Sequence, residues 1–505
     1  MADEVRGWDY IIVGGGSAGA VLAARLSEDP EADVLVLEAG HDFRTEETPQ
    51  AFRHRKIDLE TSNNPDYWWA GLENRRNPAQ EPTPFLRGRG VGGTSLVNIL
   101  FALRGTSQDF DRWTASGAEG WSWENVLPYY AKLEDEHDFP DAPYHGSGGP
   151  VPVYREPQEG WGGVDLAFRD AVLDAGIPWA EDHNAPGATG LSPFAMNIRD
   201  GRRVTTNDAY LEPARDRANL TVRGDAHVDT VVVEPGSKRV TGVRLVGGET
   251  LGLNPGGEVV LAAGALMSPA ILVRSGIGEA QDLHELGIDV VADLPVGQGV
   301  QDHPTVIVPL PTTAQAKESP YDRFTNVTLR YSSGLAGAGE NDMMIIPNNH
   351  WMGGSWLLIV QQQVFSRGRL LFTSRDPLSP PFIEHRLLTD ESDLVRAADA
   401  LDRVAEFVAK PSFTSILEAK PDIPTVEDLP KVVWDGGHLS ATVHMGSPDD
   451  PATVVDPECR VLGVDGLRVV DASVMPEVVR GNTLLSVLMI AERIADRIKT
   501  ARPGT

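Results

Sequence analysis

The sequence contains few cysteines and few basic residues, and both shortages limit what the protein can be. Its single cysteine, Cys459, cannot close an intrachain disulfide, which excludes a disulfide framework and favours a reducing, cytoplasmic location. Lys and Arg number 44 against 73 Asp and Glu, so the formal net charge is −29. Nucleic acids and anionic membranes attract basic surfaces, so we expect neither as a partner.

Long apolar runs and several catalytic motifs are missing as well. No apolar stretch reaches the roughly 18 residues of a membrane span, and residues 1–16 lack the basic start of a signal peptide. The 12 histidines show no spacing such as H-E-x-x-H, so we expect no metal site. A G-x-S-x-G nucleophile elbow is also absent. We therefore expect a soluble chain without integral membrane contact.

The 505 residues are enough for two domains, because single hydrophobic cores stop growing at roughly 250–300 residues. The beginning of the chain predicts a βαβ unit, with a buried strand at residues 9–13, a helix at 20–26 and a second buried strand at 34–37. Such a unit is the opening of an α/β fold.

The turn after the first strand carries G-x-G-x-x-G as Gly14, Gly16 and Gly19, and Glu38 follows 19 residues after Gly19. The first glycine of such a motif allows the tight turn, the second lets the backbone approach a pyrophosphate, and the third lets the helix pack on the strand. The pyrophosphate then lies at the positive helix N-terminus. Glu38 can accept hydrogen bonds from ribose hydroxyls, which favours FAD or NAD over NADP.

The later sequence indicates a second region inserted into the first. Residues 40–84 are polar and irregular, and we interpret them as a covering segment. The pattern of apolar and polar residues changes between residues 304 and 434, and after residue 436 it resembles that of the first part of the chain again. We therefore expect interleaved domains. The expected strands are 220–222, 228–234, 240–246, 258–263, 356–365, 369–374 and 467–470, and the expected helices are 121–136, 391–409, 484–498 and one that opens near Ser268 and Pro269.

Four further segments carry long motifs. GRGVGGTSLVN at residues 88–98 continues through Ala102 and Gly105 to Asp111, and GALMSPAILVRSGIG occupies 264–278. Near the C-terminus, HLSATVHMG at 438–446 and LRVVDASVMP at 467–476 are followed by Asn482 and Thr483. Together with the glycine fingerprint, these segments resemble the glucose-methanol-choline oxidoreductases, which are FAD-dependent alcohol oxidases and dehydrogenases. The overall layout is most similar to the compact bacterial alcohol oxidases of that family.

The resemblance implies an α/β fold, α+β overall. A Rossmann-like FAD-binding domain is expected to be interleaved with a substrate domain built on an antiparallel sheet with helices. The FAD-binding domain would comprise residues 1–155, 201–303 and 436–505, and the substrate domain 156–200 and 304–435.

The resemblance also assigns cofactor contacts along the chain. The ADP half of FAD is expected at Gly14, Gly16, Ser17, Gly19, Glu38 and the backbone of Val228. The flavin, its ribityl chain and the pyrophosphate are expected at Gly93, Thr94, Asn98, Ala102, Asp471, Ala472, Asn482 and Thr483. Some members attach FAD through a histidine just before the asparagine that corresponds to Asn98. Val97 stands there, so we expect non-covalent FAD.

Oxidation of an alcohol needs a hydride acceptor, which flavin N5 supplies, and a base for the hydroxyl proton. His438 is the candidate base, because an imidazole pKa of about 6.5 suits proton transfer near neutral pH. Asn482, 44 residues later, would donate its amide hydrogen to the substrate oxygen and orient the substrate. His303 and His444 are expected to be structural.

The expected substrate is a small alcohol. A quaternary ammonium group would want an aromatic cage, but Gly437 precedes His438, which favours a neutral primary alcohol, aryl and furan alcohols included. Residues 356–365, with His350 and Trp351, are candidates for the pocket wall.

The sequence leaves several alternatives open. The electron acceptor is oxygen or another carrier, and the oligomeric state, a homo-oligomer included, is not decided. Hydroxynitrile-lyase chemistry without net flavin redox is the alternative activity on the same scaffold. A non-catalytic flavin-binding protein is disfavoured because both His438 and Asn482 are present.

Overall fold

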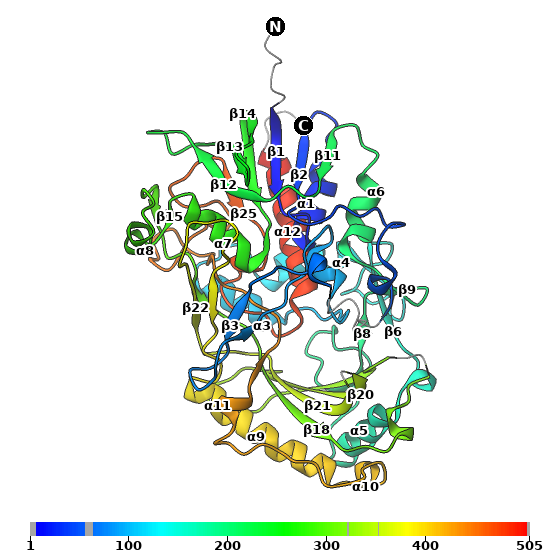
Figure 1. Ribbon diagram of the computed structural model, residues 1–505. Helices are drawn as coiled ribbons and strands as arrows, with labels where there is room; N and C mark the ends of the chain where they lie inside the picture. The colour runs from blue at the N-terminus through cyan, green and yellow to red at the C-terminus, as the bar shows by residue number, and fades with distance from the viewer. Residues whose placement is uncertain (1–6, 56–63, 321–322, 352, 502–505) are drawn as a thin grey trace.

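The computed structural model describes residues 7–55, 64–320, 323–351 and 353–501. Residues 1–6 and 502–505, the two ends of the predicted FAD-binding domain, and residues 56–63 of the predicted covering segment lie outside the described ranges. Figure 1 shows an upper region built around one sheet and a lower region built around another. Within the described ranges, no helix has the length and hydropathy needed to cross a membrane.

The upper sheet gathers strands from three separate parts of the chain. Its order is β11-β2-β1-β14-β13-β12, with β25 beside β14. β1, β2, β11, β14 and β25 run parallel, whereas β12, β13 and β14 form antiparallel pairs. The strands are β1 (Trp8–Val13), β2 (Val34–Leu37), β11 (Leu220–Arg223), β12 (Val228–Val233), β13 (Val240–Leu245), β14 (Thr250–Leu261) and β25 (Leu467–Val469).

The first and last helices of the chain pack together on this sheet (Figure 1). α1 (Ser17–Leu26) is apolar on nearly all sides and almost completely buried, and α12 (Thr483–Ala501) buries most of its first four turns. Arg25 of α1 donates from Nε to both carboxylate oxygens of the buried Glu492 of α12, at 3.0 and 2.9 Å. The two ends of the sequence therefore share one hydrophobic core, as the predicted interleaving requires.

The helix expected to open near Ser268 and Pro269 starts earlier than predicted. α7 (Gly264–Arg274) begins four residues before Ser268, so Pro269 lies inside the helix. A proline has no N–H to donate to the carbonyl of Ala265. The hydroxyl of Thr442 donates to that carbonyl at 2.7 Å instead, and this distant contact makes the internal proline tolerable.

The lower sheet is fully antiparallel, as the resemblance implied, with the order β24-β18-β21-β20-β19-β7. Helices cover its outer face along the bottom of Figure 1. The strands are β24 (Trp434–Asp435), β18 (Pro304–Leu310), β21 (Gly354–Gln361), β20 (Met343–Trp351), β19 (Val327–Tyr331) and β7 (Gly190–Pro193), and the helices are α5 (Gly163–Asp174), α9 (Glu391–Val408), α10 (Pro411–Thr414) and α11 (Leu429–Val432).

Smaller elements join the two regions. The helix predicted at residues 121–136 ends at Leu133, because the next three residues form strand β5. β5, β6 and β8 form a sheet that joins both sides of the predicted boundary at 155, so the domain limits stay a prediction. The remaining helices and strands are α3 (Ser107–Ala115), α4 (Trp123–Leu133), α6 (Glu212–Ala214), α8 (Ala280–Glu285), β3 (Glu73–Arg75), β4 (Thr83–Pro84), β5 (Glu134–Glu136), β6 (Val151–Arg155), β8 (Ala195–Met196), β9 (Ile198–Arg199), β10 (Arg202–Arg203), β15 (Ile277–Gly278), β16 (Ala292–Asp293), β17 (Gln298–Val300), β22 (Gly368–Leu371) and β23 (Phe382–Glu384).

Candidate active site

The glycine fingerprint lies between β1 and α1, and its first and third glycines are needed for packing. Gly14 has a φ of +105°, and a Cβ there would lie 2.6 Å from the carbonyl oxygen of Ala262. A Cβ on Gly19 would lie 1.8 Å from the carbonyl oxygen of Gly14. The N-terminus of α1, at Gly16 and Ser17, has no side-chain cap and no acidic residue in its first turn. Its free N–H groups and positive dipole fit a diphosphate.

A second glycine turn packs directly against the first. Gly93 opens a short 3₁₀ turn, Gly93–Leu96, that contains Thr94, and its φ is +52°. A Cβ on Gly93 would lie 2.8 Å from Cα of Gly16. The residues predicted to hold the two halves of FAD are therefore in backbone contact. This contact fits one extended cofactor lying across both turns.

Glu38, at the end of β2, ties three glycine turns together. Its Oε2 accepts the N–H of Gly15 at 2.8 Å, and its Oε1 accepts the N–H groups of Gly40 and Gly90 at 2.8 and 3.2 Å. The residue is 6% exposed. Because an ionised carboxylate offers about four acceptor sites, Glu38 keeps capacity for a ribose hydroxyl.

Asp471 is arranged differently from Glu38, because the chain itself holds its carboxylate. Its oxygens accept from the N–H of Gly264 at 2.9 Å, the hydroxyl of Ser268 at 2.6 Å and the N–H of Ser473 at 2.8 Å. These three donors, two of them on α7, hold the carboxylate within the protein. Asp471 and its neighbour Ala472 are therefore suited to meet a cofactor through their backbone.

The remaining predicted cofactor residues occupy defined positions. Oδ1 of Asn98 accepts from the N–H of Leu100 at 3.2 Å and from Arg203 at 2.8 Å. Ala102 is completely buried, its N–H donating to the carbonyl of Ala195 at 2.9 Å. Val228 and Thr483 are the first residues of β12 and α12, and Val97 packs in a small apolar cluster with Phe52 and Leu96.

The predicted catalytic pair meets in space. His438 follows β24 and Asn482 directly precedes α12, and Nδ2 of Asn482 lies 3.2 Å from Nε2 of His438. Asn482 is 8% exposed, and its Oδ1 has no hydrogen-bond partner among the described residues. Burial lowers the pKa of His438 well below its usual 6.5, and the nearby His303 and Arg87 lower it further. The imidazole is therefore neutral near pH 7 and can accept a proton.

His303, expected to be structural, directly contacts the predicted base. It lies where the chain leaves the upper region, one residue before β18. Its Nδ1 lies 2.8 Å from Nδ1 of His438, and its Nε2 lies 3.0 Å from the carbonyl oxygen of Val479. Oδ1 of Asp302 accepts the backbone N–H groups of both histidines at 2.8 Å. The two histidines are 135 residues apart, and no sequence spacing signals their contact.

Arg87 is a second residue that the sequence interpretation missed. It immediately precedes the 88–98 motif, and a Cβ on Gly437 would lie 3.6 Å from its Nη1. Its guanidinium packs over the ring of Phe85, 4.2 Å from the centroid. Burial and the neighbouring carboxylate of Asp435 raise the pKa of Asp302 to about 7, and Arg87 opposes that rise. A cation thus lies beside the candidate active site, in a buried charged cluster.

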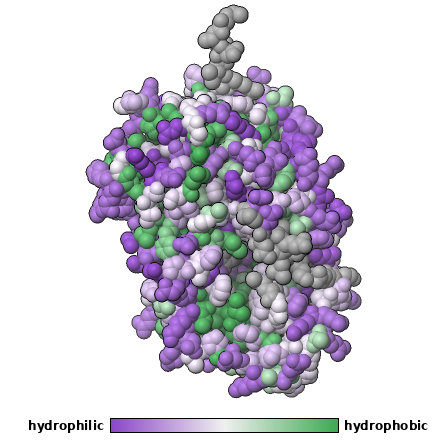
Figure 2. Space-filling view, in the orientation of Figure 1, coloured by the Kyte–Doolittle hydropathy of each residue, from purple (hydrophilic) through white to green (hydrophobic). Residues whose placement is uncertain are grey.

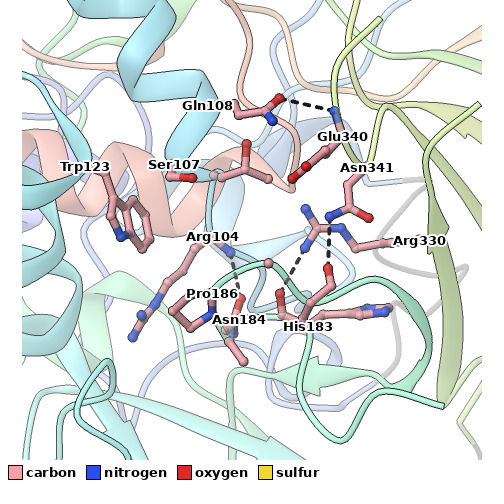
Figure 3. A pocket seen from close by; sticks show the side chains of 15 residues that line it. Arg104, Ser107, Gln108, Trp123, His183, Asn184, Pro186, Arg330, Glu340 and Asn341 are labelled. Atoms are coloured by element: carbon pink, nitrogen blue, oxygen red, sulfur yellow. Dashed lines mark hydrogen bonds between the residues drawn. The ribbon is translucent and has the colours of Figure 1, made fainter. Parts of the chain in front are cut away.

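A small polar pocket lies elsewhere, between α3 and the lower sheet. Its volume is about 60 Å³, and Figure 3 shows Gln108 hydrogen-bonded across it to the backbone of Glu340. Arg330 on its wall donates to the carbonyl of His183 at 3.0 Å. Neither His438 nor Asn482 lines this pocket, so it is not the catalytic site. Among the residues that the structure describes, no group of three or more His, Cys, Asp and Glu could hold a metal ion.

Comparison with known proteins gives consistent results along the whole chain. Family models described as GMC oxidoreductase match residues 8–305 and 364–491. The chain is 36% identical to 5-(hydroxymethyl)furfural oxidase from Methylovorus sp., with 99% of this chain and 100% of that protein covered. It is 33% identical to an oxygen-dependent choline dehydrogenase from Chromohalobacter salexigens, with 99% and 96% covered.

Solved structures agree with the sequence comparisons. The crystal structure of pyridoxine 4-oxidase from Mesorbium loti superposes with a TM-score of 0.88 at 28% sequence identity. The superposition covers 98% of this chain and 100% of that one.

Proposed function

The chain belongs to the GMC oxidoreductase family, and on this premise we propose that it oxidises a neutral primary alcohol, with His438 as general base and Asn482 as the donor that orients the substrate oxygen. It is an FAD-dependent enzyme that acts on CH–OH donors. The observation that supports the roles of the two residues is their contact, 3.2 Å between Nδ2 of Asn482 and Nε2 of His438.

When bound, FAD supplies the hydride acceptor. The neutral imidazole of His438 faces Asn482 with Nε2, and a substrate hydroxyl that contacts both side chains can donate its proton to Nε2. The same oxygen can accept the N–H of Asn482, which stabilises the negative charge that develops as the proton leaves. A positioned base of this kind contributes typically 10²–10⁴-fold to the rate.

The cofactor contacts are part of the proposal. The ADP half would bind at the uncapped N-terminus of α1 and at Glu38, and the flavin half would lie along the Gly93 turn, near Asn98 and Asn482. Val97 is a buried apolar residue without a nucleophilic atom, which supports non-covalent attachment at that position. The interleaved domain limits given above are proposed on the same basis.

Two features favour a neutral substrate. Arg87 lies beside His438, so a cationic substrate such as choline would meet a like charge in a buried setting. The face of the lower sheet toward the upper region carries a buried apolar cluster. Figure 2 shows, in addition, a patch of apolar surface on the lower part of the molecule. Val360 of that cluster pairs with Thr305, two residues from His303, and Trp351 packs against the cluster. His350 is exposed and does not belong to this wall.

Oxygen is the electron acceptor that we propose, because the similar proteins include two oxidases and an oxygen-dependent dehydrogenase. The single buried cysteine supports the cytoplasmic location proposed from the sequence. The oligomeric state, which the sequence left open with a homo-oligomer included, is to be decided by light scattering of the protein in solution.

The test is anaerobic reduction of the bound flavin across a panel of aryl, furan and aliphatic alcohols, with choline included, followed by air and peroxide detection. We expect bleaching of the flavin by neutral alcohols and peroxide on reoxidation. Hydroxynitrile-lyase chemistry predicts no bleaching by any alcohol, and faster reduction by choline than by neutral alcohols would refute the substrate class.

A further inference from the structure

His303 contacts the side of His438 that faces away from Asn482. The two Nδ1 atoms are 2.8 Å apart, while Asn482 lies 3.2 Å from Nε2 of His438. Nε2 of His303 lies 3.0 Å from the carbonyl oxygen of Val479. His303 has no exposed surface, so water does not compete for these hydrogen bonds.

The acceptors of His303 determine where its proton lies. A carbonyl oxygen only accepts hydrogen bonds, so Nε2 of His303 must carry the hydrogen that points at Val479. Burial lowers the pKa of His303 to about 4, against the opposing effect of backbone hydrogen bonds to Val479 and Gln362. The ring is therefore neutral near pH 7 and has a single N–H. Its Nδ1 is then an acceptor, and the hydrogen shared by the two Nδ1 atoms belongs to His438.

We propose that His303 is a positioning residue, which fixes His438 in the Nδ1–H tautomer and so keeps Nε2 without a hydrogen, as the atom that accepts the substrate's hydroxyl proton. The inference rests on the proposed role of His438 as the base. In the other tautomer Nε2 would carry a hydrogen, and it could then donate to the substrate oxygen but not accept its proton.

The backbone fixes the relative position of the two rings. Oδ1 of Asp302 accepts the backbone N–H groups of His303 and His438, which anchors both residues to one atom. Val479, which orients His303, lies three residues before Asn482, which contacts the other face of His438. These contacts link His303, His438 and Asn482 to one another, so the same interactions determine the tautomer of His438 and its position relative to Asn482.

Two substitutions separate the acceptor role from packing. His303→Asn places an amide oxygen near the position of Nδ1 and keeps an acceptor for His438. His303→Gln instead keeps a donor for Val479 and removes the acceptor. Flavin content and the unfolding midpoint of each holoenzyme establish that the variants are folded.

We expect His303→Gln to slow anaerobic flavin reduction by about 10²-fold with KM nearly unchanged, because most of the contribution of a general base is lost. His303→Asn should stay within tenfold of the wild type. In the serine-protease triad, a histidine held in the wrong tautomer lowers kcat about 10⁴-fold. Equal reduction rates for the Gln and Asn variants would overturn the proposal.

The tautomer is measured directly on the wild-type holoenzyme with ¹⁵N-labelled histidine, where the signal of His438 is the one lost in His438→Ala. We expect a hydrogen on Nδ1 and none on Nε2, and a hydrogen on Nε2 would overturn the proposal even if neither variant folds. This spectrum needs no substrate. If no alcohol reduces the wild-type flavin, the proposed function fails, whereas the tautomer assignment is still decided.

Discussion

The contact between the two glycine turns predicts that a side chain at Gly93 weakens FAD binding. A methyl group on Gly93 would lie 2.8 Å from Cα of Gly16, and ordinary contacts begin near 3.4 Å, so the turns would have to separate by about 0.6 Å. Overpacking of that kind costs about 1–3 kcal/mol. The φ of +52° adds about 1–2 kcal/mol for any residue with a Cβ.

These terms add to about 2–5 kcal/mol. If FAD spans both turns, much of that cost falls on the bound state, because the cofactor requires the two turns in their native separation. Gly93→Ala should then weaken FAD binding by about 30- to 4,000-fold, at 1.4 kcal/mol for each factor of ten. Titration of the apoprotein with FAD, followed by flavin fluorescence, measures this change.

Gly176→Ala is the matched control. Gly176 has a φ of +79°, but no atom lies within 4 Å of the position of its Cβ, so the substitution introduces backbone strain without a clash. It should lower the free energy of unfolding by about 1–2 kcal/mol and leave FAD binding unchanged. If Gly93→Ala binds FAD within twofold of the wild type, the proposed placement of the cofactor across the two turns is refuted.

Three further outcomes are expected. Glu134→Ala removes the carboxylate that pairs with the buried guanidinium of Arg104 and should lower the free energy of unfolding in urea by about 3–5 kcal/mol. Glu249→Ala breaks an exposed ion pair with Arg223 and should leave the urea midpoint unchanged. Equal effects of the two substitutions would refute the argument from burial. Burial lowers the pKa of His385 to about 4 in the folded protein. As pH falls from about 6.5 toward 4, this histidine is therefore protonated in the unfolded chain but not in the folded one, and the folded state loses stability. His385→Gln should remove roughly 2 kcal/mol of the stability loss between pH 7.5 and pH 5, and an unaltered pH dependence would contradict this account. With Val97 before Asn98, acid precipitation should release all the flavin into the supernatant, and flavin retained on the precipitate would show a covalent bond.

Local patterns predicted the parts of the fold that depend on local physics. The opening βαβ unit is confirmed, because continuous apolar strands and a glycine turn determine it within about 30 residues. The final helix begins one residue before its predicted start at Leu484. The predicted start of α7 was wrong, because Pro269 is tolerated inside the helix. The hydroxyl of Thr442, far away in the sequence, donates the hydrogen bond that the missing N–H of Pro269 cannot.

In the candidate site, too, some features follow from local motifs and others depend on contacts between distant parts of the chain. Motifs were sufficient to propose His438 and Asn482 as candidates, whereas their contact requires the chain to bring together the loop after β24 and the start of α12. The contact between His303 and His438 depends on how two distant loops fold around Asp302, and no periodicity encodes it. Arg87 was missed because the effect of a cation on the pKa of His438 becomes apparent only when the neighbours of the cation are known.

The central claim is that His438 takes the proton of the substrate, and single-turnover reduction of the flavin in His438→Ala tests it most directly. His444→Ala serves as the control, because it removes a histidine from the same segment without touching the pair. We predict that His438→Ala keeps its FAD and reduces it about 10²–10⁴-fold more slowly under anaerobic conditions with the best alcohol, while His444→Ala reduces at the wild-type rate. Wild-type reduction by a flavin-loaded His438→Ala enzyme would contradict the account.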